Sequence, residues 1–332
     1  MIDASETTTR GRLLPAQAAP SPYALWALPL LLPGLLLLLG GCAASRHAHE
    51  PADLGRPRSS AEMLAAIERP GPVEVETVTA ADWVVARSGV INLEHPEARA
   101  AGLEDGDEPI SIYIHVLRHP RFGTFLIDSG VESGFRDPDG NDRVGALVAS
   151  AMGTENLRIH VTTAEWLARQ EEPLAGVFLS HLHLDHVMGL PDVPPDTPIY
   201  AGPGETEASL FLHLFTRGTI DRMLEGSGPI REWRYAGDAG GRFAGVVDVF
   251  GDASVWAIHV PGHTPGSTAY LVRTPDGPVL YVGDASHTRW GWEHGVEPGT
   301  FSLDGPTSAR SLAALRKLAR EVPEIEVRLG HQ

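Results

Sequence analysis

One short stretch of the sequence restricts the fold more than any other. Residues 179–187 read LSHLHLDHV, so three histidines and one aspartate directly follow the apolar run 176–180. A short apolar run of this kind predicts a buried β-strand, and polar side chains at its end are typical of a functional loop. These groups would be hard to satisfy if they were packed together without a common partner. Imidazole and carboxylate suit zinc and similar divalent ions, so the stretch predicts a metal site; the alternative is a polar loop that only caps backbone groups.

The spacing inside this stretch brings its polar side chains together. His181 and His183 are two residues apart, so at the end of an extended segment they point in the same direction. Asp185 and His186 can turn toward the same point if the chain bends into a helix there. We therefore expect the four side chains to share one site.

The rest of the sequence predicts a domain of mixed α and β structure. From Val73 onward β-rich runs alternate with short helical patterns, and the runs tend to end in polar residues. This pattern indicates an α/β or α+β fold whose chemistry lies at the ends of strands. The predicted strands are 111–117, 123–128, 176–180, 198–201, 255–260, 267–273, 277–282 and 325–329, and the predicted helices are 61–68, 162–170, 205–216 and one capped by Ser308.

The N-terminal segment has the pattern of an export signal. An apolar run from Tyr23 to Leu39 follows two arginines and ends just before the single cysteine, Cys42. This resembles a bacterial lipoprotein signal, which implies cleavage before Cys42 and a lipid anchor on that residue. An uncleaved membrane span is the alternative, although two prolines interrupt the run. We expect a signal peptide over residues 1–41, a mostly disordered tether over 42–72, and an exported lipoprotein anchored at the periplasmic face or cell surface.

Composition argues against a disulfide-stabilised scaffold and against a nucleic-acid-binding protein. A single cysteine cannot form a disulfide framework within one chain. The formal net charge is −17, and an acidic surface repels phosphate backbones. We therefore expect no nucleic-acid partner.

Later motifs add further candidate ligands, each directly after a β-rich run. His263 lies in PGHTPGS, Asp284 in VGD and His331 in LGH, while an early run ends in LIDSG with Asp128. Taken singly, the first three are more typical of a surface histidine, a turn residue and a disordered terminus. Together with the first motif they give five histidines and two aspartates. That number of ligands fits two metal ions.

These motifs, in this order, resemble the metallo-β-lactamase superfamily. Its His-x-His-x-Asp-His signature is matched by residues 181–186, and the resemblance extends from about Val73 to the C-terminus. It implies a four-layer αββα sandwich over residues 73–332 that binds two divalent ions, with zinc the most expected. By the family pattern one ion is held by His181, His183 and His263 and the other by Asp185, His186 and His331, with Asp284 bridging them.

The resemblance also implies a reaction. Two divalent cations lower the pKa of a shared water, which makes hydroxide available as a nucleophile, and they polarise the bond under attack. Asp185 and His287 are the catalytic candidates; His287 stands where acyl-homoserine lactonases usually carry a tyrosine, and it either donates a proton to the leaving group or only packs. Asp128 is a candidate partner that orients a ligand histidine.

The ligand pattern resembles the acyl-homoserine lactonase group most closely. The expected reaction is therefore the opening of a lactone, or the cleavage of a related carboxylic ester, on a small-molecule substrate. The lack of a cysteine near the motifs disfavours β-lactamases with a Cys ligand, and glyoxalase-II-like thioesterases continue into a helical domain where only Gln332 follows here. Phosphoester hydrolases, and a metal-binding surface lipoprotein without turnover, also remain as alternatives.

Apolar residues near the motifs suggest walls for a substrate pocket. The segment 210–215 and Met223 supply apolar side chains that suit an acyl chain, although an ordinary helical core is the better explanation for most of them. Trp290 and Trp292 follow His287 and either wall the site or pack over a loop.

Overall fold

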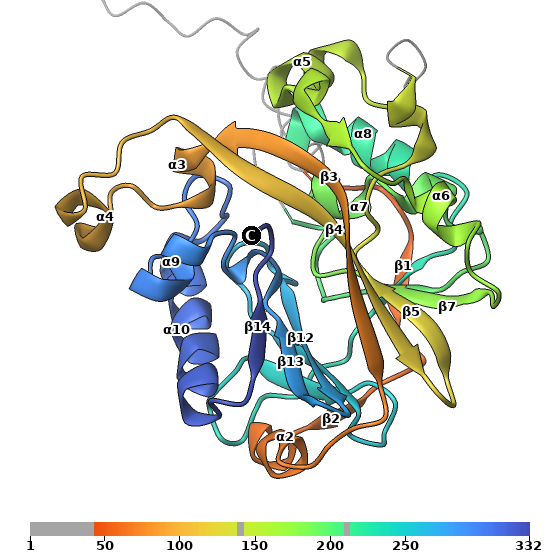
Figure 1. Ribbon diagram of the computed structural model, residues 1–332, viewed down its shortest axis with the longest axis vertical. Coiled ribbons are helices and arrows are strands. Elements are labelled where there is room, and N and C mark those ends of the chain that lie inside the picture. Colours follow the sequence, from red (N-terminus) through yellow and green to blue (C-terminus); the bar gives the residue numbers. More distant parts are fainter. Residues whose placement is uncertain (1–42, 138–142, 209–212) are drawn as a thin grey trace, which may run out of the picture. The chain divides into compact units, whose positions relative to one another are not determined.

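Two β-sheets lie face to face with helices on their outer sides in the computed structural model, which describes residues 43–137, 143–208 and 213–332 (Figure 1). This arrangement confirms the expected mixed α/β class and the αββα sandwich. None of the helices within these three ranges is long and apolar enough to span a membrane. The predicted signal peptide and Cys42 lie outside the described residues.

The first sheet carries the first histidine motif. Its strands β5, β7, β8 and β9 run parallel, whereas β4 and β5 form the predicted antiparallel hairpin. Because parallel strands end at the same edge of a sheet, the loops that follow β5 and β7 meet there. The order of the eight strands is β1 (His49–Pro51), β9 (Ile230–Glu232), β8 (Ile199–Ala201), β7 (Leu174–Phe178), β5 (Gly123–Ile127), β4 (Asp107–His119), β3 (Glu74–Ala86) and β6 (Arg158–Ile159).

The second sheet carries the later motifs. Its strands β11, β12 and β13 alternate in direction and β13 pairs in parallel with β14, so β11, β13 and β14 end at one edge. Each of these ends leads into one of the later motifs. The order of the six strands is β14 (Glu326–Arg328), β13 (Gly277–Tyr281), β12 (Thr268–Thr274), β11 (Val255–His259), β10 (Gly245–Asp248) and β2 (Arg56–Arg58).

The helices form the two outer layers. Those against the second sheet are α2 (Ser60–Ile67), α9 (Arg289–His294) and α10 (Gly305–Glu321), and those against the first are α5 (Ala146–Met152), α6 (Thr163–Leu167), α7 (Leu184–Val187) and α8 (His213–Met223). The short helices α3 (Arg87–Val90) and α4 (Pro96–Ala100) lie in the connection from β3 to β4 (Figure 1). Short 3₁₀ turns are η1 (Ser133–Arg136), η2 (Thr154–Asn156), η3 (Leu190–Asp192) and η4 (Gly283–Ala285).

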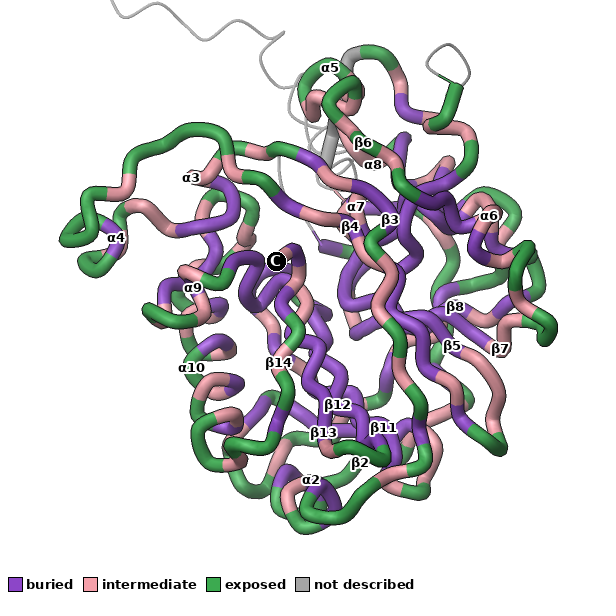
Figure 2. The backbone as a smooth tube through the Cα atoms, in the orientation of Figure 1, coloured by how far each residue is buried: buried purple, intermediate pink, exposed green. Residues whose placement is uncertain are grey.

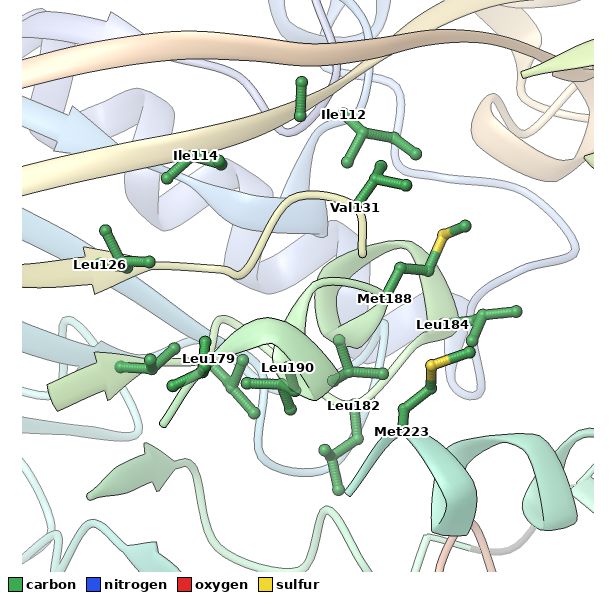
Figure 3. Packing of buried hydrophobic residues seen from close by; sticks show 14 of the residues in the cluster. Ile112, Ile114, Leu126, Val131, Leu179, Leu182, Leu184, Met188, Leu190 and Met223 are labelled. Carbon is green, nitrogen blue, oxygen red and sulfur yellow. The ribbon is translucent and has the colours of Figure 1, made fainter. Parts of the chain in front are cut away.

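Three apolar layers hold the sandwich together: one lies between the two sheets, and one lies between each sheet and its helices. Between the sheets, the Phe178 ring lies 4.8 Å from Phe125 and 5.7 Å from Tyr270 of the opposite sheet. Figure 3 shows the layer between the first sheet and its helices, to which Leu179 and Met188 both belong. The strands at the centre of the sandwich are largely buried (Figure 2). Burying each such side chain contributes roughly 1.5–3 kcal/mol, so the strand ends are held on a rigid framework.

The segment expected to be a tether is ordered where the structure describes it. Residues 43–72 contain β1, β2 and α2, so this stretch is ordered rather than mostly disordered, and α2 confirms the helix predicted over residues 61–68. The two strands are short and exposed and pair with β9 and β10 at sheet edges through backbone groups, which needs no alternation of apolar residues. Helix α2 begins with a capping box between Ser59 and Glu62 and buries Met63 and Ile67.

Two helix boundaries also differ from those expected. Residues 203–207 form a turn in which Glu205 is buried, and the described part of α8 spans His213–Met223. Helix α10 begins earlier than expected, because Asp304 rather than Ser308 is its N-cap and accepts a hydrogen bond from the Thr307 N–H. Its predicted apolar face of Leu312, Leu315 and Leu318 is buried as expected.

Candidate metal centre

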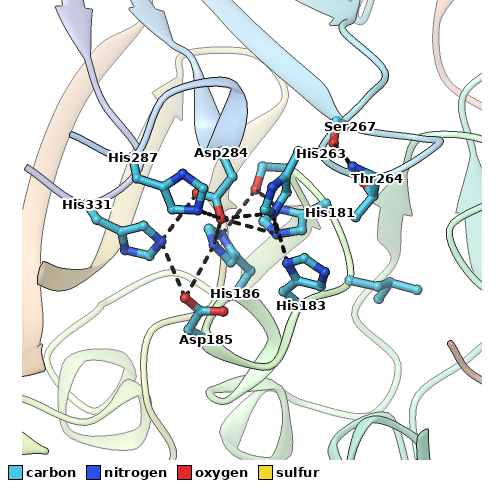
Figure 4. A network of polar contacts seen from close by, with 12 residues as sticks. His181, His183, Asp185, His186, His263, Thr264, Ser267, Asp284, His287 and His331 are labelled. Atoms are coloured by element: carbon cyan, nitrogen blue, oxygen red, sulfur yellow. Dashed lines mark hydrogen bonds and ion pairs between the residues drawn. The ribbon is translucent and has the colours of Figure 1, made fainter. Parts of the chain in front are cut away.

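Side chains from both sheets converge where the strands end. The loops after β7 and β11 and those after β13 and β14 bring together all seven expected ligands and His287, as Figure 4 shows. The bend predicted after His183 is helix α7, which turns Asp185 and His186 toward the same point. The side chain of Asp185 is 18 % exposed, whereas that of Asp284 is 2 % exposed. The cluster is therefore buried on most sides and more open at Asp185.

The carboxylate of Asp284 lies at the centre of the cluster. Its Oδ2 atom is 3.0 Å from His287 Nε2, 3.2 Å from His263 Nε2, 3.3 Å from His186 Nε2 and 3.4 Å from His181 Nε2. Four ring nitrogens around one oxygen exceed the hydrogen bonds that a carboxylate oxygen usually accepts. The rings therefore share a centre that the Asp284 carboxylate alone does not satisfy.

The remaining ligand atoms fall into two groups. In the group that we call the first half-site, His263 Nε2 lies 3.2 Å from His181 Nε2 and 2.8 Å from His183 Nδ1. In the second half-site, Asp185 Oδ2 lies 3.3 Å from His331 Nε2 and 3.8 Å from His186 Nε2. Within each group the ligand atoms lie no more than 4.8 Å apart; the first comprises His181, His183, His263 and Asp284, and the second Asp185, His186 and His331.

Several polar atoms of the cluster are buried without a hydrogen-bond partner. These include His186 Nε2, His331 Nε2 and Asp284 Oδ1. An unsatisfied buried polar atom costs about 1–3 kcal/mol, so leaving three of them in one place needs a reason. Imidazole nitrogens and carboxylate oxygens together are the ligands that zinc and similar divalent ions take. The residues present therefore fit a pair of divalent cations.

Asp128 supports the second half-site from behind. Its backbone φ of 58° lies in the left-handed region, which is uncommon for a residue other than glycine. The carboxylate accepts hydrogen bonds from the Ser180 N–H at 2.8 Å and from Ser180 Oγ at 2.9 Å. It also lies 2.8 Å from His186 Nδ1, which confirms the predicted contact with a candidate ligand histidine. This contact directs the opposite nitrogen of the His186 ring toward the centre.

Other histidines are oriented in the same way. The carbonyl oxygen of Ser111 lies 2.9 Å from His331 Nδ1, and a carbonyl can only accept, so this nitrogen carries the proton. In a neutral ring Nε2 then keeps a lone pair that faces the centre. The first half-site relies on hydroxyl groups instead, since Ser302 Oγ lies 3.2 Å from His263 Nδ1.

His287 lies beside the shared carboxylate and outside the two half-sites, although it forms a third group of possible ligands with Asp284 and His331, whose ligand atoms also lie within 4.8 Å of one another. Its Nε2 is 3.0 Å from Asp284 Oδ2, and its Nδ1 is buried without a partner. Burial lowers the pKa of His287 to about 4, so the ring is neutral at pH 7. With the proton on Nε2, this nitrogen donates to Asp284 and only a lone pair is left unsatisfied at Nδ1.

The aromatic and apolar residues suggested as pocket walls have other partners. Trp290 stacks on His294 at 4.3 Å, and Trp292 packs against the apolar layer beneath α10. Met223 is fully buried in the core of the first sheet. Residues 210–212 lie outside the described part of the chain, as do the side chains of Leu214 and Phe215. Packing against these partners thus accounts for Trp290, Trp292 and Met223.

Glu205 is a neighbour of the cluster that the sequence did not indicate. It is 1 % exposed and accepts a hydrogen bond from the Leu182 N–H, between two candidate ligands. Burial raises the pKa of its carboxyl to about 7 against the hydrogen bonds that favour the charged form. The only signal was its place in a glycine-rich turn, residues 202–205, after an apolar strand.

Comparisons with known proteins assign the family. The sequence model described as the metallo-beta-lactamase superfamily matches residues 107–331, more than half of the chain, so the protein belongs to this superfamily. The N-acyl homoserine lactonase AttM of Agrobacterium fabrum (strain C58 / ATCC 33970) is 33 % identical over 156 residues, which are 47 % of this chain and 57 % of that protein. The match thus spans little more than half the length of that relative. An N-acyl homoserine lactonase of a Bacillus species is 29 % identical over 229 residues, or 68 % of this chain and 82 % of that protein.

Solved structures show the same fold. A variant of B. thuringiensis AiiA with N-decanoyl-L-homoserine at its active site has a TM-score of 0.55 and 20 % identity, over 79 % of this chain and 94 % of that one. AidC, a dizinc quorum-quenching lactonase in complex with a product, has a TM-score of 0.55 and 15 % identity, over 84 % of this chain and 91 % of that one. At these identities the likeness shows the αββα fold alone.

Proposed function

We propose that the protein is a dinuclear metal-dependent hydrolase that opens lactones or cleaves related carboxylic esters. The observation that carries the proposal is the pair of half-sites around the single carboxylate of Asp284. The lactonase relatives favour a lactone over the other substrates of the superfamily. Two divalent cations held there, most suitably zinc, would activate water and polarise the ester carbonyl.

The chain's own residues divide the remaining tasks. His183 and Asp185 are less buried than the rest of the cluster, so we infer that the substrate approaches from their side. The fixed orientation of His186 and His331, by Asp128 and the Ser111 carbonyl, keeps the site in shape without substrate. Water adds to the carbonyl carbon, the ring C–O bond breaks, and the products are a carboxylate and an alcohol on one molecule.

His287 acts as a hydrogen-bond donor in this proposal. A ring whose pKa is about 4 carries no extra proton at pH 7, so it is a poor general acid. A neutral ring with the proton on Nε2 can still donate to an oxygen that gains negative charge. Because Nε2 already faces the shared carboxylate at 3.0 Å, such an oxygen would lie within its reach at the same centre. His287 thus stabilises developing negative charge in this proposal, in place of the proton transfer to the leaving group that the sequence suggested.

A substrate panel tests the proposal. The full-length protein, loaded with zinc, is assayed on acyl-homoserine lactones, a simple γ-lactone, an aryl ester, a glutathione thioester, a phosphotriester and a β-lactam, beside His183→Ala. We expect the lactones to react fastest, and His183→Ala to lose both this activity and zinc from the first half-site. Lactone opening that survives His183→Ala undiminished contradicts the mechanism. Fastest turnover of the thioester, phosphotriester or β-lactam contradicts the substrate class.

We also propose that a lipid on Cys42 anchors the protein to a membrane. The support is the apolar run that ends just before this cysteine. Cell fractionation of Cys42→Ser should show the protein released from the membrane or mislocalised. Unaltered retention of this variant would point to an uncleaved span instead.

A further inference from the structure

Glu205 joins the two loops that carry the first half-site. Its Oε2 accepts a hydrogen bond from the Leu182 N–H at 2.9 Å. Its Oε1 accepts from Thr264 Oγ1 at 2.5 Å and from the Gly266 N–H at 2.8 Å. Leu182 separates His181 from His183, and Thr264 directly follows His263. A single carboxylate therefore bridges the two loops that carry the three histidines of this half-site.

Close backbone packing brings Glu205 into this position. A Cβ atom on Gly202 would lie 1.7 Å from the carbonyl oxygen of Gly266, and one on Gly266 would lie 2.8 Å from Glu205 Cγ. Any larger residue at either position would push the turn away from the loop after β11. The glycines thus allow the turn after β8 to reach the first half-site.

The contacts of Glu205 suit a carboxylate rather than an amide. Three donors converge on its two oxygens, and an ionised carboxyl only accepts hydrogen bonds. A glutamine of the same shape would turn an NH₂ group toward at least one of these donors. Because the residue is 1 % exposed, water cannot take over the lost bond.

We propose that Glu205 is a positioning residue for the first half-site: it locks the loop of His181 and His183 to the loop of His263. The inference rests on the proposed function, because it takes the half-site to bind a cation. Both oxygens of Glu205 are occupied by loop donors, so it acts through the loops rather than as a ligand.

The effect should be confined to one half-site. The rings of His186 and His331 are oriented by Asp128 and the Ser111 carbonyl, which hold them independently of the Glu205 turn. A residue that only stabilised the fold would weaken both half-sites alike. Unequal loss of metal from the two positions is therefore the result specific to this proposal.

The test compares Glu205→Gln with Glu232→Gln in the full-length protein. Glu232 is a matched control because it accepts a hydrogen bond from the Gly204 N–H of the same turn, at 2.9 Å, and pairs with His49. Zinc content is measured against chelator-buffered free zinc. Anomalous scattering from crystals assigns the zinc to each position. We expect Glu205→Gln to weaken zinc binding about 10- to 100-fold at the first half-site only, and Glu232→Gln to bind like the unaltered protein.

A second variant covers the case in which Glu205→Gln does not fold. Thr264→Val keeps the shape of the side chain and removes one of the three donors, so it should give a smaller loss at the same half-site. Unchanged zinc binding in both variants, or equal loss at both half-sites, overturns the proposal. If the unaltered protein binds two zinc ions but opens no lactone, the proposed reaction fails while the zinc data still decide the role of Glu205.

Discussion

The two half-sites share Asp284 but are built differently. The first offers three imidazoles, and its support comes from the Ser302 hydroxyl and from loops joined by Glu205. The second contains the carboxylate of Asp185, and its histidines are oriented by the Asp128 carboxylate and a backbone carbonyl. The second half-site thus brings more negative charge to a cation, and a charged hydrogen bond orients one of its ligands. We infer that it binds the more firmly held ion.

Because the two half-sites are supported differently, different changes should weaken each of them. The first depends on the relative placement of two loops, so a change outside its ligands can open it. The second depends on one charged hydrogen bond, between Asp128 and His186, at 2.8 Å. Hydrogen bonds to charged groups are about twice as strong as neutral ones, which makes this contact the main support of the second half-site.

Removing the shared carboxylate should erase the difference between the half-sites. Asp284→Asn keeps the size of the side chain but removes the charge that five ring nitrogens surround. We expect kcat/KM for a lactone to fall by more than about 10³-fold, since loss of an outer partner alone costs about 10- to 100-fold. Steady-state kinetics and zinc content measure this. A variant that keeps two zinc ions and most activity would show that Asp284 does not bridge them.

His287 should affect the reaction without affecting either half-site. His287→Phe removes the Nε2 donor that lies 3.0 Å from Asp284 and keeps a flat ring. We expect kcat to fall by roughly 10²-fold with zinc content unchanged. Since the pKa of the neutral ring is about 4, the ratio of the two kcat values should stay constant from pH 6 to pH 8. Loss of zinc in this variant would make His287 a ligand instead.

Loss of a side chain that orients a ligand histidine should lower zinc affinity more at the second half-site than at the first. Asp128→Asn removes a charged partner of His186, whereas Ser302→Ala removes a hydroxyl beside His263. We expect zinc affinity at the second half-site to drop about 10- to 100-fold in the first variant, and that at the first half-site only a few-fold in the other. Competition with a chromogenic chelator compares them. An equal or larger effect of Ser302→Ala would reverse our ranking of the half-sites.

The sequence predicted which side chains lie together at the centre of the cluster, because these residues follow strands. His181, His183, Asp185 and His186 are neighbours in the chain and follow a clear apolar run, so their meeting needs only local geometry. Asp284 and His331 are distant in sequence, yet each also follows a run that forms a strand, and strand ends share an edge. The resemblance to the superfamily predicted that Asp284 and His331, from the second sheet, share one site with the motif that follows β7 of the first sheet.

What the sequence did not reveal depends on backbone contacts. Glu205 is one of 43 acidic residues, and two of its three partners are backbone N–H groups, which leave no pattern in the side chains. The strands β1 and β2 are likewise held by backbone pairing to sheet edges and contain no apolar alternation. Side-chain patterns predicted the cluster of histidines and carboxylates at the strand ends, while the contacts that support this cluster appear only in the folded chain.

The smallest expected effect is at Asp238, which stabilises the fold without supporting either half-site. Asp238 accepts hydrogen bonds from the Ser60 N–H and the Arg242 N–H, each at 2.9 Å, at the start of α2. Burial opposes the charge, but these hydrogen bonds lower the pKa of Asp238 from 3.8 to about 2. A lowered pKa in the folded state contributes stability above pH 4, and this contribution disappears as the pH falls through 2.

Asp238→Asn should therefore lower the free energy of unfolding by about 1–2 kcal/mol at pH 7, after allowance for partial exposure of the carboxyl. Urea unfolding of the zinc-free protein at pH 7 and at pH 3 measures the change, and the gap between the two proteins should narrow at the lower pH. Zinc binding at both half-sites should match that of the unaltered protein at pH 7, because α2 packs on the outer face of the second sheet and touches neither set of ligands. A gap that stays constant with pH would mean that the hydrogen bonds of Asp238, rather than its charge, hold this segment to the domain.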